Sequence, residues 1–152
     1  MEVVPADRVL VVELKGHPWE AGYDPAEPLA NAVAGIVAAA GERRIVVSSF
    51  NPMALQVIRE RTPGAPTAVL TSAAFDLASN LAAAIAGGHA ECHVPAALLD
   101  AAFVESAHRA GRRVAAWTVD EADRIRAFAG WGVDAIISDD PRAARAAIKP
   151  AG

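Results

Sequence analysis

The residues in this sequence best suited to chemistry are a carboxylate and an amine two positions apart. Glu13 and Lys15 occur in the segment Glu-Leu-Lys-Gly-His, at the end of an apolar run that starts at residue 9. In a β-strand, side chains two positions apart point to the same face. Together they are suited to a divalent cation, through the carboxylate, and to a phosphate, through the ammonium group. An ion pair at a strand end is the alternative interpretation.

The histidines, the paired serines and the one cysteine form weaker patterns. His89, Cys92 and His93 have the spacing His-x-x-Cys-His, which matches no standard zinc pattern and lacks a second ligand pair. His93, at the end of a short predicted strand, is the member placed to face the mouth of a site. We interpret Ser48 and Ser49 as packing or capping residues, because the glycines of a nucleophile elbow are absent.

Two tryptophans and two further histidines complete the candidates. Trp117 ends a predicted strand, where its ring can cover the apolar part of a ligand, and a core tryptophan is the alternative. Trp131 lies between two glycines in a helix-to-strand turn and is expected to be structural. We expect His17 in a loop and His108 on a helix surface. The sequence contains neither Gly-x-Gly-x-x-Gly nor a Walker segment, so nothing indicates nucleotide binding.

These residues are positioned by short apolar runs that alternate with longer helix-forming segments. The predicted strands are Val9–Leu14, Arg44–Ser48, Thr67–Thr71, Glu91–Val94, Arg113–Val119 and Ala135–Ser138. The predicted helices are Leu29–Ala40, Pro52–Glu60, Phe75–Ala86, Pro95–Ala110, Glu121–Phe128 and Pro141–Ile148. Alternation of this kind predicts an α/β fold with a parallel sheet, either open and doubly wound or closed as a (β/α) barrel. Sites in both arrangements form at the carboxyl ends of the strands.

Composition limits the class of protein further. The chain has 152 residues, of which 53% are hydrophobic, and a formal net charge of −4. One domain over residues 1–152 is therefore expected, and nucleic acid is disfavoured as a partner. Cys92 is the single cysteine, the N-terminus lacks the pattern of a signal peptide, and no apolar run reaches about 18 residues. We therefore expect a cytoplasmic protein that does not enter a membrane.

Four segments of the sequence, taken together and in their order along the chain, resemble the motifs of a known family. They are Val-Val-Glu-Leu-Lys-Gly at 11–16, Val-Val-Ser-Ser-Phe-Asn-Pro at 46–52, Ala-His-Arg-Ala-Gly-Arg-Arg-Val-Ala-Ala-Trp-Thr-Val-Asp at 107–120 and Gly-Val-Asp-Ala-Ile-Ile-Ser-Asp-Asp-Pro at 132–141. Together they resemble the glycerophosphodiester phosphodiesterase family, from about residue 5 to residue 148. The resemblance implies a TIM barrel that hydrolyses glycerophosphodiesters to glycerol 3-phosphate and an alcohol, with a divalent cation, calcium or magnesium.

Residue by residue, the resemblance implies roles for three side chains. Glu13 matches a metal-binding carboxylate, Lys15 a phosphate-facing lysine and Trp117 a substrate-contacting tryptophan. The chain has no counterpart of the family's two catalytic histidines, its first arginine and two of its three metal carboxylates. His17 and His93 do not occupy the positions of the catalytic histidines. The resemblance therefore assigns no catalytic residue in this chain.

The family's barrel has two βα units before the strand that carries Glu-x-Lys. The resemblance thus implies an incomplete TIM-type barrel of about six βα units, with the first two missing. One glutamate is a weak site for a hard cation, and hydrolysis needs a positioned acid and base, so we expect negligible activity from the chain alone. Three interpretations stay open: an enzyme completed by an upstream segment or a partner polypeptide, a non-catalytic binder of phosphate or glycerol phosphate, and an inert fragment. Open strand edges also predict a homo-oligomer.

Overall fold

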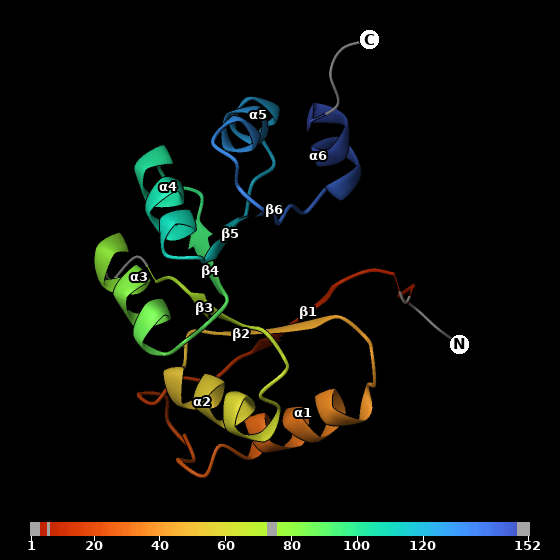
Figure 1. Ribbon diagram of the computed structural model, residues 1–152, viewed down its shortest axis with the longest axis vertical. Coiled ribbons are helices and arrows are strands. Elements are labelled where there is room, and N and C mark those ends of the chain that lie inside the picture. The colour runs from red at the N-terminus through yellow and green to blue at the C-terminus, as the bar shows by residue number, and fades with distance from the viewer. Residues whose placement is uncertain (1–3, 6, 73–75, 149–152) are drawn as a thin grey trace. The chain divides into compact units, whose positions relative to one another are not determined.

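Strands and helices alternate along the chain in the computed structural model (Figure 1), which describes residues 4–5, 7–72 and 76–148. Within these ranges there are six strands, and each is followed by a helix. The strand pairs are parallel, so the predicted fold class, an α/β fold of the incomplete (β/α)-barrel type, is confirmed. The chain divides into two compact units, residues 1–70 and 71–152, each described by itself. A single domain over residues 1–152 stays a prediction.

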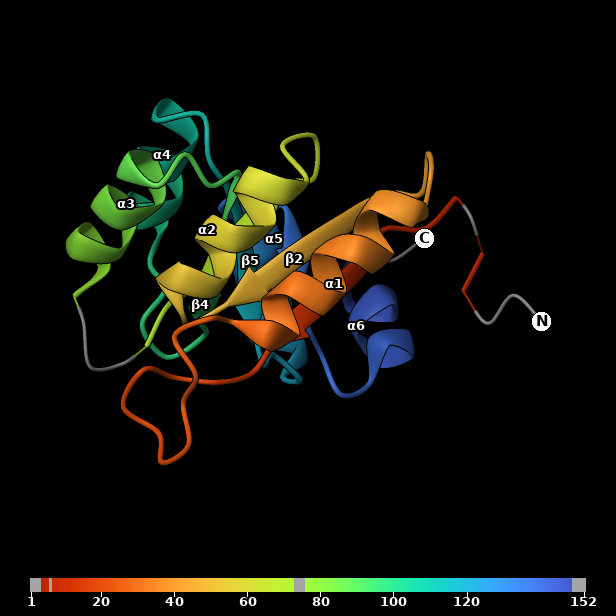
Figure 2. The same ribbon diagram turned by 90° about the horizontal axis from the view of Figure 1, so that it is seen from below.

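Unit 1 consists of three parallel strands and two helices. They are β1 (Leu10–Leu14), α1 (Pro28–Ala39), β2 (Ile45–Ser49), α2 (Pro52–Arg61) and β3 (Thr67–Leu70). β2 pairs with both other strands, and its register places Ser48 opposite Glu13 of β1. Figure 2 shows α1 and α2 side by side along one face of β2. The carboxyl ends of β1 and β2 are therefore neighbours.

The core of unit 1 lies between its strands and its helices. Leu14, Ile45 and Val47 from the strands pack with Ala30, Ala34, Ala54 and Ile58 from the helices. The helix side contributes mainly alanines, whose small side chains let the helices approach the sheet closely. Because side chains alternate along a strand, a Leu14 that faces the helices places its neighbour Glu13 on the other face.

The two helices of unit 1 begin in different ways. Asn51 caps α2, since its Oδ1 accepts a hydrogen bond from the backbone N–H of Met53 at 3.0 Å, as the Asn-Pro dipeptide predicts. Glu27 occupies the same position before α1, but its side chain does not cap the helix and its backbone is left-handed, with φ of 49°. The sequence placed the start of this helix one residue late, at Leu29.

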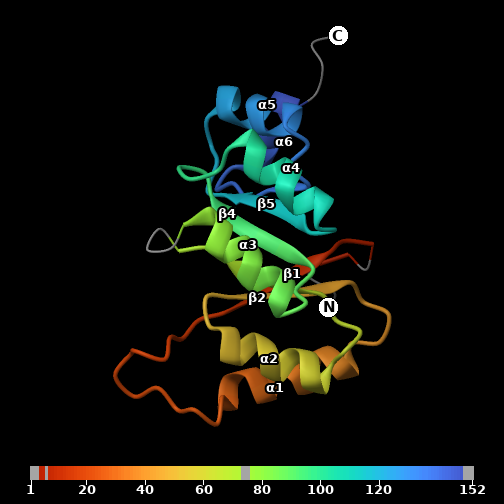
Figure 3. The same cartoon turned by 60° about the vertical axis from the view of Figure 1, so that its left-hand side comes forward.

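Unit 2 consists of three strands and four helices. They are α3 (Leu77–Ala86), β4 (Glu91–Pro95), α4 (Ala101–Arg109), β5 (Arg113–Trp117), α5 (Ala122–Gly130), β6 (Ala135–Ile136) and α6 (Pro141–Ile148). β5 pairs in parallel with β4 and β6, and Trp117 lies opposite Pro95. Figure 3 shows α3 beside β4 and α4 beside β5. Within the described ranges, no helix is both long and apolar enough to cross a membrane.

The structure moves boundaries of predicted elements in unit 2. The helix predicted from Pro95 begins at Ala101, because Asp100 accepts a hydrogen bond from the backbone N–H of Phe103 at 2.7 Å and so fixes the cap there. The last predicted strand shortens to Ala135–Ile136. Phe75, the first residue of another predicted helix, lies outside the described residues.

The packing of unit 1 predicts a large cost for one core truncation. Replacing Ile58, which is fully buried, with alanine should lower the free energy of unfolding by about 2–5 kcal/mol, because the cavity left behind cannot close completely. Urea denaturation followed by circular dichroism measures the change. Ile36→Ala is the matched control, since this side chain is 67% exposed, and should shift the value by less than about 0.5 kcal/mol. Equal effects of the two substitutions would contradict the packing described.

Candidate functional site

Glu13 and Lys15 are neighbours at the end of β1. The Lys15 Nζ lies 3.3 Å from Glu13 Oε1, and the two side chains are 82% and 37% exposed, respectively. The interpretation as an ion pair therefore describes the structure as it stands. An ion pair this exposed stabilises a fold little, since water and salt screen it. Both charges consequently stay accessible to a ligand, and their roles toward a cation and a phosphate stay predictions.

His17 lies in the loop after β1, as expected. Its ring stacks on Trp19, with centroids 4.6 Å apart and planes 16° apart, and is tilted against Phe50 at 5.5 Å. The backbone N–H of His17 donates to Glu20 Oε2 at 3.0 Å. These contacts hold the imidazole between Trp19 of the same loop and Phe50, which follows β2, and they fit a structural residue.

The serine pair at the end of β2 serves packing and capping. Ser49 Oγ donates a hydrogen bond to the carbonyl oxygen of Leu14 at 2.8 Å and accepts one from the backbone N–H of Asn51 at 3.0 Å. Ser49 is 1% exposed and Ser48 is 2% exposed. The Ser49 hydroxyl thus ties the ends of β1 and β2 together, as predicted for a capping serine.

A buried polar cluster in unit 1 escaped the sequence analysis. Glu27 Oε1 accepts hydrogen bonds from the Tyr23 hydroxyl at 2.7 Å and from Asn51 Nδ2 at 2.6 Å. The hydrogen bond that the Tyr23 hydroxyl donates to Glu27 raises the pKa of Tyr23 above its usual value, since the bond holds the phenolic proton. Asn51 was recognised as a cap, but its contact with Glu27 spans 24 residues and has no local signal.

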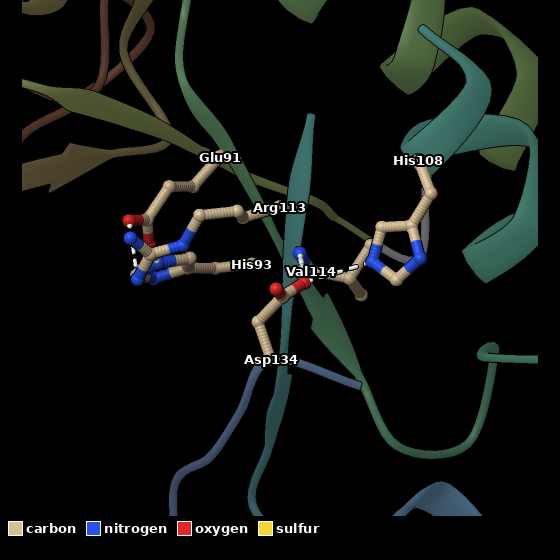
Figure 4. Close-up of polar contacts among 6 residues, drawn as sticks. All are labelled: Glu91, His93, His108, Arg113, Val114 and Asp134. Carbon is tan, nitrogen blue, oxygen red and sulfur yellow. Dashed lines mark hydrogen bonds and ion pairs between the residues drawn. The ribbon is translucent and has the colours of Figure 1, made fainter. Parts of the chain in front are cut away.

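His93 is buried beside a carboxylate in unit 2. Its Nε2 lies 3.0 Å from Glu91 Oε2, while the other oxygen of Glu91 lies 3.1 Å from an Arg113 guanidinium nitrogen (Figure 4). His93 and Glu91 are 2% and 4% exposed. Alternation along β4 places both side chains on one face, where Arg113 neutralises the buried carboxylate. The expectation that His93 faces the mouth of a site stays a prediction.

Cys92 lies between these two residues and is buried. It is 1% exposed, and burial raises the pKa of its thiol to about 11, because the thiolate would lose its hydration. Within the described ranges, no three His, Cys, Asp or Glu side chains are grouped so that they could hold a metal ion. The His-x-x-Cys-His segment accordingly forms no metal centre among these residues.

Trp117 ends β5 and is half-buried. Its carbonyl oxygen accepts a hydrogen bond from the backbone N–H of Ala96 at 2.6 Å. Shortly after it, Asp120 Oδ1 accepts bonds from the Ser138 hydroxyl at 2.7 Å and the backbone N–H of Asp139 at 2.9 Å. These bonds lower the pKa of Asp120 by stabilising the carboxylate, and they connect the loops that follow β5 and β6.

His108 lies in α4, as predicted, and has a partner that the sequence did not reveal. Its Nε2 lies 2.9 Å from Asp134 Oδ2, which also accepts a bond from the backbone N–H of Val114 at 2.8 Å. Figure 4 shows this pair and the Glu91 cluster on opposite sides of β5. Asp134 thus connects α4, β5 and the start of β6, which is a structural role.

The predicted site residues are distributed over both units. The structure brings Glu13 and Lys15 together in unit 1, whereas His93 and Trp117 lie on neighbouring strands of unit 2. Calcium and magnesium require several oxygen ligands, and within the described ranges Glu13 belongs to no group of three His, Cys, Asp or Glu side chains that could hold a metal ion. The described residues by themselves therefore do not complete a site for a divalent cation.

Residues 15–143 match the sequence profile of the glycerophosphoryl diester phosphodiesterase family. YhdW of Bacillus subtilis (strain 168), a provisionally assigned glycerophosphodiester phosphodiesterase, is 29% identical over 133 residues, which cover 87% of this chain and 53% of YhdW. The matching region thus accounts for most of this chain.

Solved structures are similar over the same region. A provisionally assigned glycerophosphoryl diester phosphodiesterase from Silicibacter pomeroyi DSS-3 has a TM-score of 0.77 and 29% identity, over 92% of this chain and 50% of that one. An Oleispira antarctica phosphodiesterase, solved with its product sn-glycerol-3-phosphate, has a TM-score of 0.68 and 23% identity, over 80% of this chain and 51% of that one. The second likeness shows a shared fold. The chain spans about half the length of these relatives.

The burial of Cys92 predicts that its thiol resists modification in the folded protein. At pH 8.5, iodoacetamide should alkylate Cys92 slowly in buffer and rapidly in 6 M guanidinium chloride, because unfolding exposes the thiol and returns its pKa from about 11 toward about 8.5. Mass spectrometry over time measures the rate. Free glutathione at the same pH gives the reference rate, and alkylation of the folded protein at that rate would contradict the burial.

Proposed function

Because the chain belongs to the glycerophosphoryl diester phosphodiesterase family, we propose that it supplies the phosphate-binding part of a site that hydrolyses glycerophosphodiesters to glycerol 3-phosphate and an alcohol. The observation that carries this proposal is the family match over residues 15–143, which begins at Lys15. The exposed Glu13–Lys15 pair at the carboxyl end of β1 supports it, since this end of a parallel strand is where such folds bind ligands.

Each proposed binding residue has a physical role toward the diester. The Lys15 ammonium group, held 3.3 Å from Glu13, binds a phosphate oxygen and balances negative charge that grows as the bond to the alcohol breaks. The half-buried Trp117 ring covers the glycerol carbons. Glu13 orients Lys15 and serves as one ligand of a divalent cation whose remaining ligands come from outside the described residues.

We propose that turnover needs groups beyond this set. Hydrolysis requires an acid for the departing alkoxide and a base for water, each worth about 10²–10⁴-fold in rate. His93 is enclosed with Glu91, at 2% exposure, and His17 is stacked on Trp19 and tilted against Phe50. By itself the chain then acts as a binder of glycerol phosphate, and a further polypeptide segment makes it an enzyme.

The edge of unit 1 supports a place for that segment. Among the described strands, β1 pairs with β2 alone, and Val9 and Val11 are 38% and 46% exposed. An edge strand with exposed valines is suited to a further parallel strand, either from a complementing N-terminal segment or from another copy of the chain. We also propose the cytoplasm as the compartment, because the single cysteine is a buried free thiol.

Binding of the phosphate product is the first expected result. Lys15→Ala should weaken the affinity for glycerol 3-phosphate by about tenfold, since an exposed ion contact with phosphate contributes on the order of 1–2 kcal/mol. Isothermal titration calorimetry measures the affinity. Arg8→Ala, which removes an exposed cation of the same unit that is paired with Asp7, is the control and should leave it unchanged. Equal affinities of the Lys15→Ala variant and the unmodified chain would remove Lys15 from the proposal.

Hydrolysis is the second expected result. The purified chain should release negligible glycerol 3-phosphate from glycerophosphodiesters, even with excess calcium or magnesium, and coexpression with the N-terminal portion of a family member should restore turnover. An enzyme-coupled assay for glycerol 3-phosphate measures the rate. Glu13→Gln should abolish the restored activity, whereas Glu42→Gln, at an exposed site of the same unit, should not. Robust turnover by the chain alone that is lost in Glu13→Ala or His93→Ala would overturn the proposal.

A further inference from the structure

Unit 1 contains a cavity of about 240 Å³ beyond the carboxyl ends of β1 and β2. Leu14, Ala30 and Ala54 form its apolar floor, and these residues also belong to the core between strands and helices. The loop between β1 and α1 closes the other side with its segment 20–24. Figure 3 shows this loop leaving the end of β1 and returning to the start of α1.

The floor of the cavity lies on the face of β1 opposite the Glu13 carboxylate. Leu14 points toward α1 and α2, and side chains alternate along a strand, so the Glu13 carboxylate lies on the opposite face of β1. The Lys15 ammonium group lies 3.3 Å from the Glu13 carboxylate. The Lys15 residue also contributes to the rim of the cavity. A ligand in the cavity would thus contact the helix side of β1.

The inner wall of the cavity holds a carboxylate whose charge is not balanced. Glu27 is 7% exposed, and its hydrogen-bond donors, the Tyr23 hydroxyl and the Asn51 amide, are both neutral. Within the described ranges, no lysine, arginine or histidine forms an ion pair with Glu27. A buried ion without a counter-ion is costly, so the cavity favours an occupant with a positive charge.

The chemistry of the walls defines the class of that occupant. Tyr23 presents an aromatic ring, and Leu14, Pro28 and Ala54 present apolar surface suited to carbon substituents. The cavity is larger than a bare ion needs and smaller than the roughly 300–1,000 Å³ typical of drug-sized ligands. The lining includes one cationic side chain, Lys15, and three acidic ones, Glu20, Asp24 and Glu27, so negative charge is in excess and disfavours anions. Aromatic, apolar and carboxylate groups together are the recognised surroundings of an organic ammonium group.

We propose that this cavity is a binding site for a small organic ammonium ion, whose charged nitrogen lies against the Glu27 carboxylate and whose carbon substituents contact Tyr23 and the apolar floor. The site is independent of the proposed hydrolase function, because none of its contacts requires Lys15 or Glu13 to bind phosphate. The positive charge of the bound ammonium ion would balance the negative charge of the Glu27 carboxylate.

Choline and its uncharged analogue 3,3-dimethylbutan-1-ol test the proposal. The two molecules have nearly the same shape, and the analogue replaces the quaternary nitrogen with carbon. Titration of the full chain, followed by backbone amide NMR, should show saturable millimolar binding of choline, with shifts concentrated in residues 20–30, and at least about tenfold weaker binding of the analogue. Equal binding of both molecules, or no binding of choline, would overturn the proposal.

Two variants and a control test whether Glu27 and Tyr23 contact the bound ammonium ion. Glu27→Gln keeps an acceptor for Asn51 and Tyr23 but removes the negative charge, and should weaken choline binding by at least about tenfold. Tyr23→Leu should weaken it several-fold through loss of the ring. Glu60→Gln, at an exposed site of the same unit, should bind choline as the unmodified chain does.

Competition separates an organic ammonium ion from a metal. Sodium, magnesium and calcium chlorides at matched ionic strength should leave choline binding unchanged, and displacement of choline by magnesium or calcium alone would overturn the proposal. If Glu27→Gln fails to fold by circular dichroism, the Tyr23→Leu variant decides. Unchanged choline affinity in that variant would then count against the site.

Discussion

Alternation of side chains along buried parallel strands is the constraint on which the rest of this molecule depends. In β1 it sends Leu14 into the core beside α1 and α2 and leaves Glu13 on the other face, where Lys15 joins it at 3.3 Å. In β4 it separates Cys92 from Glu91 and His93. β1 thus supplies an apolar side chain to its helices and polar side chains to its other face, and the face that Glu13 occupies is fixed by where the core must be.

Buried carboxylates in the two units are stabilised differently. Glu91 has both oxygens engaged, one by His93 at 3.0 Å and the other by Arg113 at 3.1 Å, so a formal cation stands beside it. Glu27 receives two hydrogen bonds from neutral groups and adopts a left-handed backbone, with φ of 49°. Strain and uncompensated charge at one residue are typical of binding sites rather than of plain packing. We therefore interpret the Glu91 cluster, which contains a cation, as structural, and Glu27, which has neutral donors only, as part of a candidate binding site.

Local signals in the sequence were sufficient for the order of elements, and they failed where distant residues meet. Asn51-Pro52 predicted the start of α2, because a cap and a first-turn proline act within one turn. The same reasoning could not foresee that the Asn51 amide would reach Glu27, or that Asp134 would hold His108 across 26 residues. The pairing of Glu13 with Lys15 was predicted, since it needs only the period of a strand. Partners at long sequence separation have no such period.

The order of strands in unit 1 bears on how the protein is made. β1 pairs with β2, and β2 with β3, so the strand partners that the structure describes for β1 and β2 lie within the first 70 residues. Ribosomes synthesise the N-terminal end first, at about 5–20 residues per second. The sheet around β2 can therefore assemble on the nascent chain while the segment for unit 2 is still being translated. Synthesis from the N-terminus and the order of the strands in the sheet both favour assembly of unit 1 before unit 2.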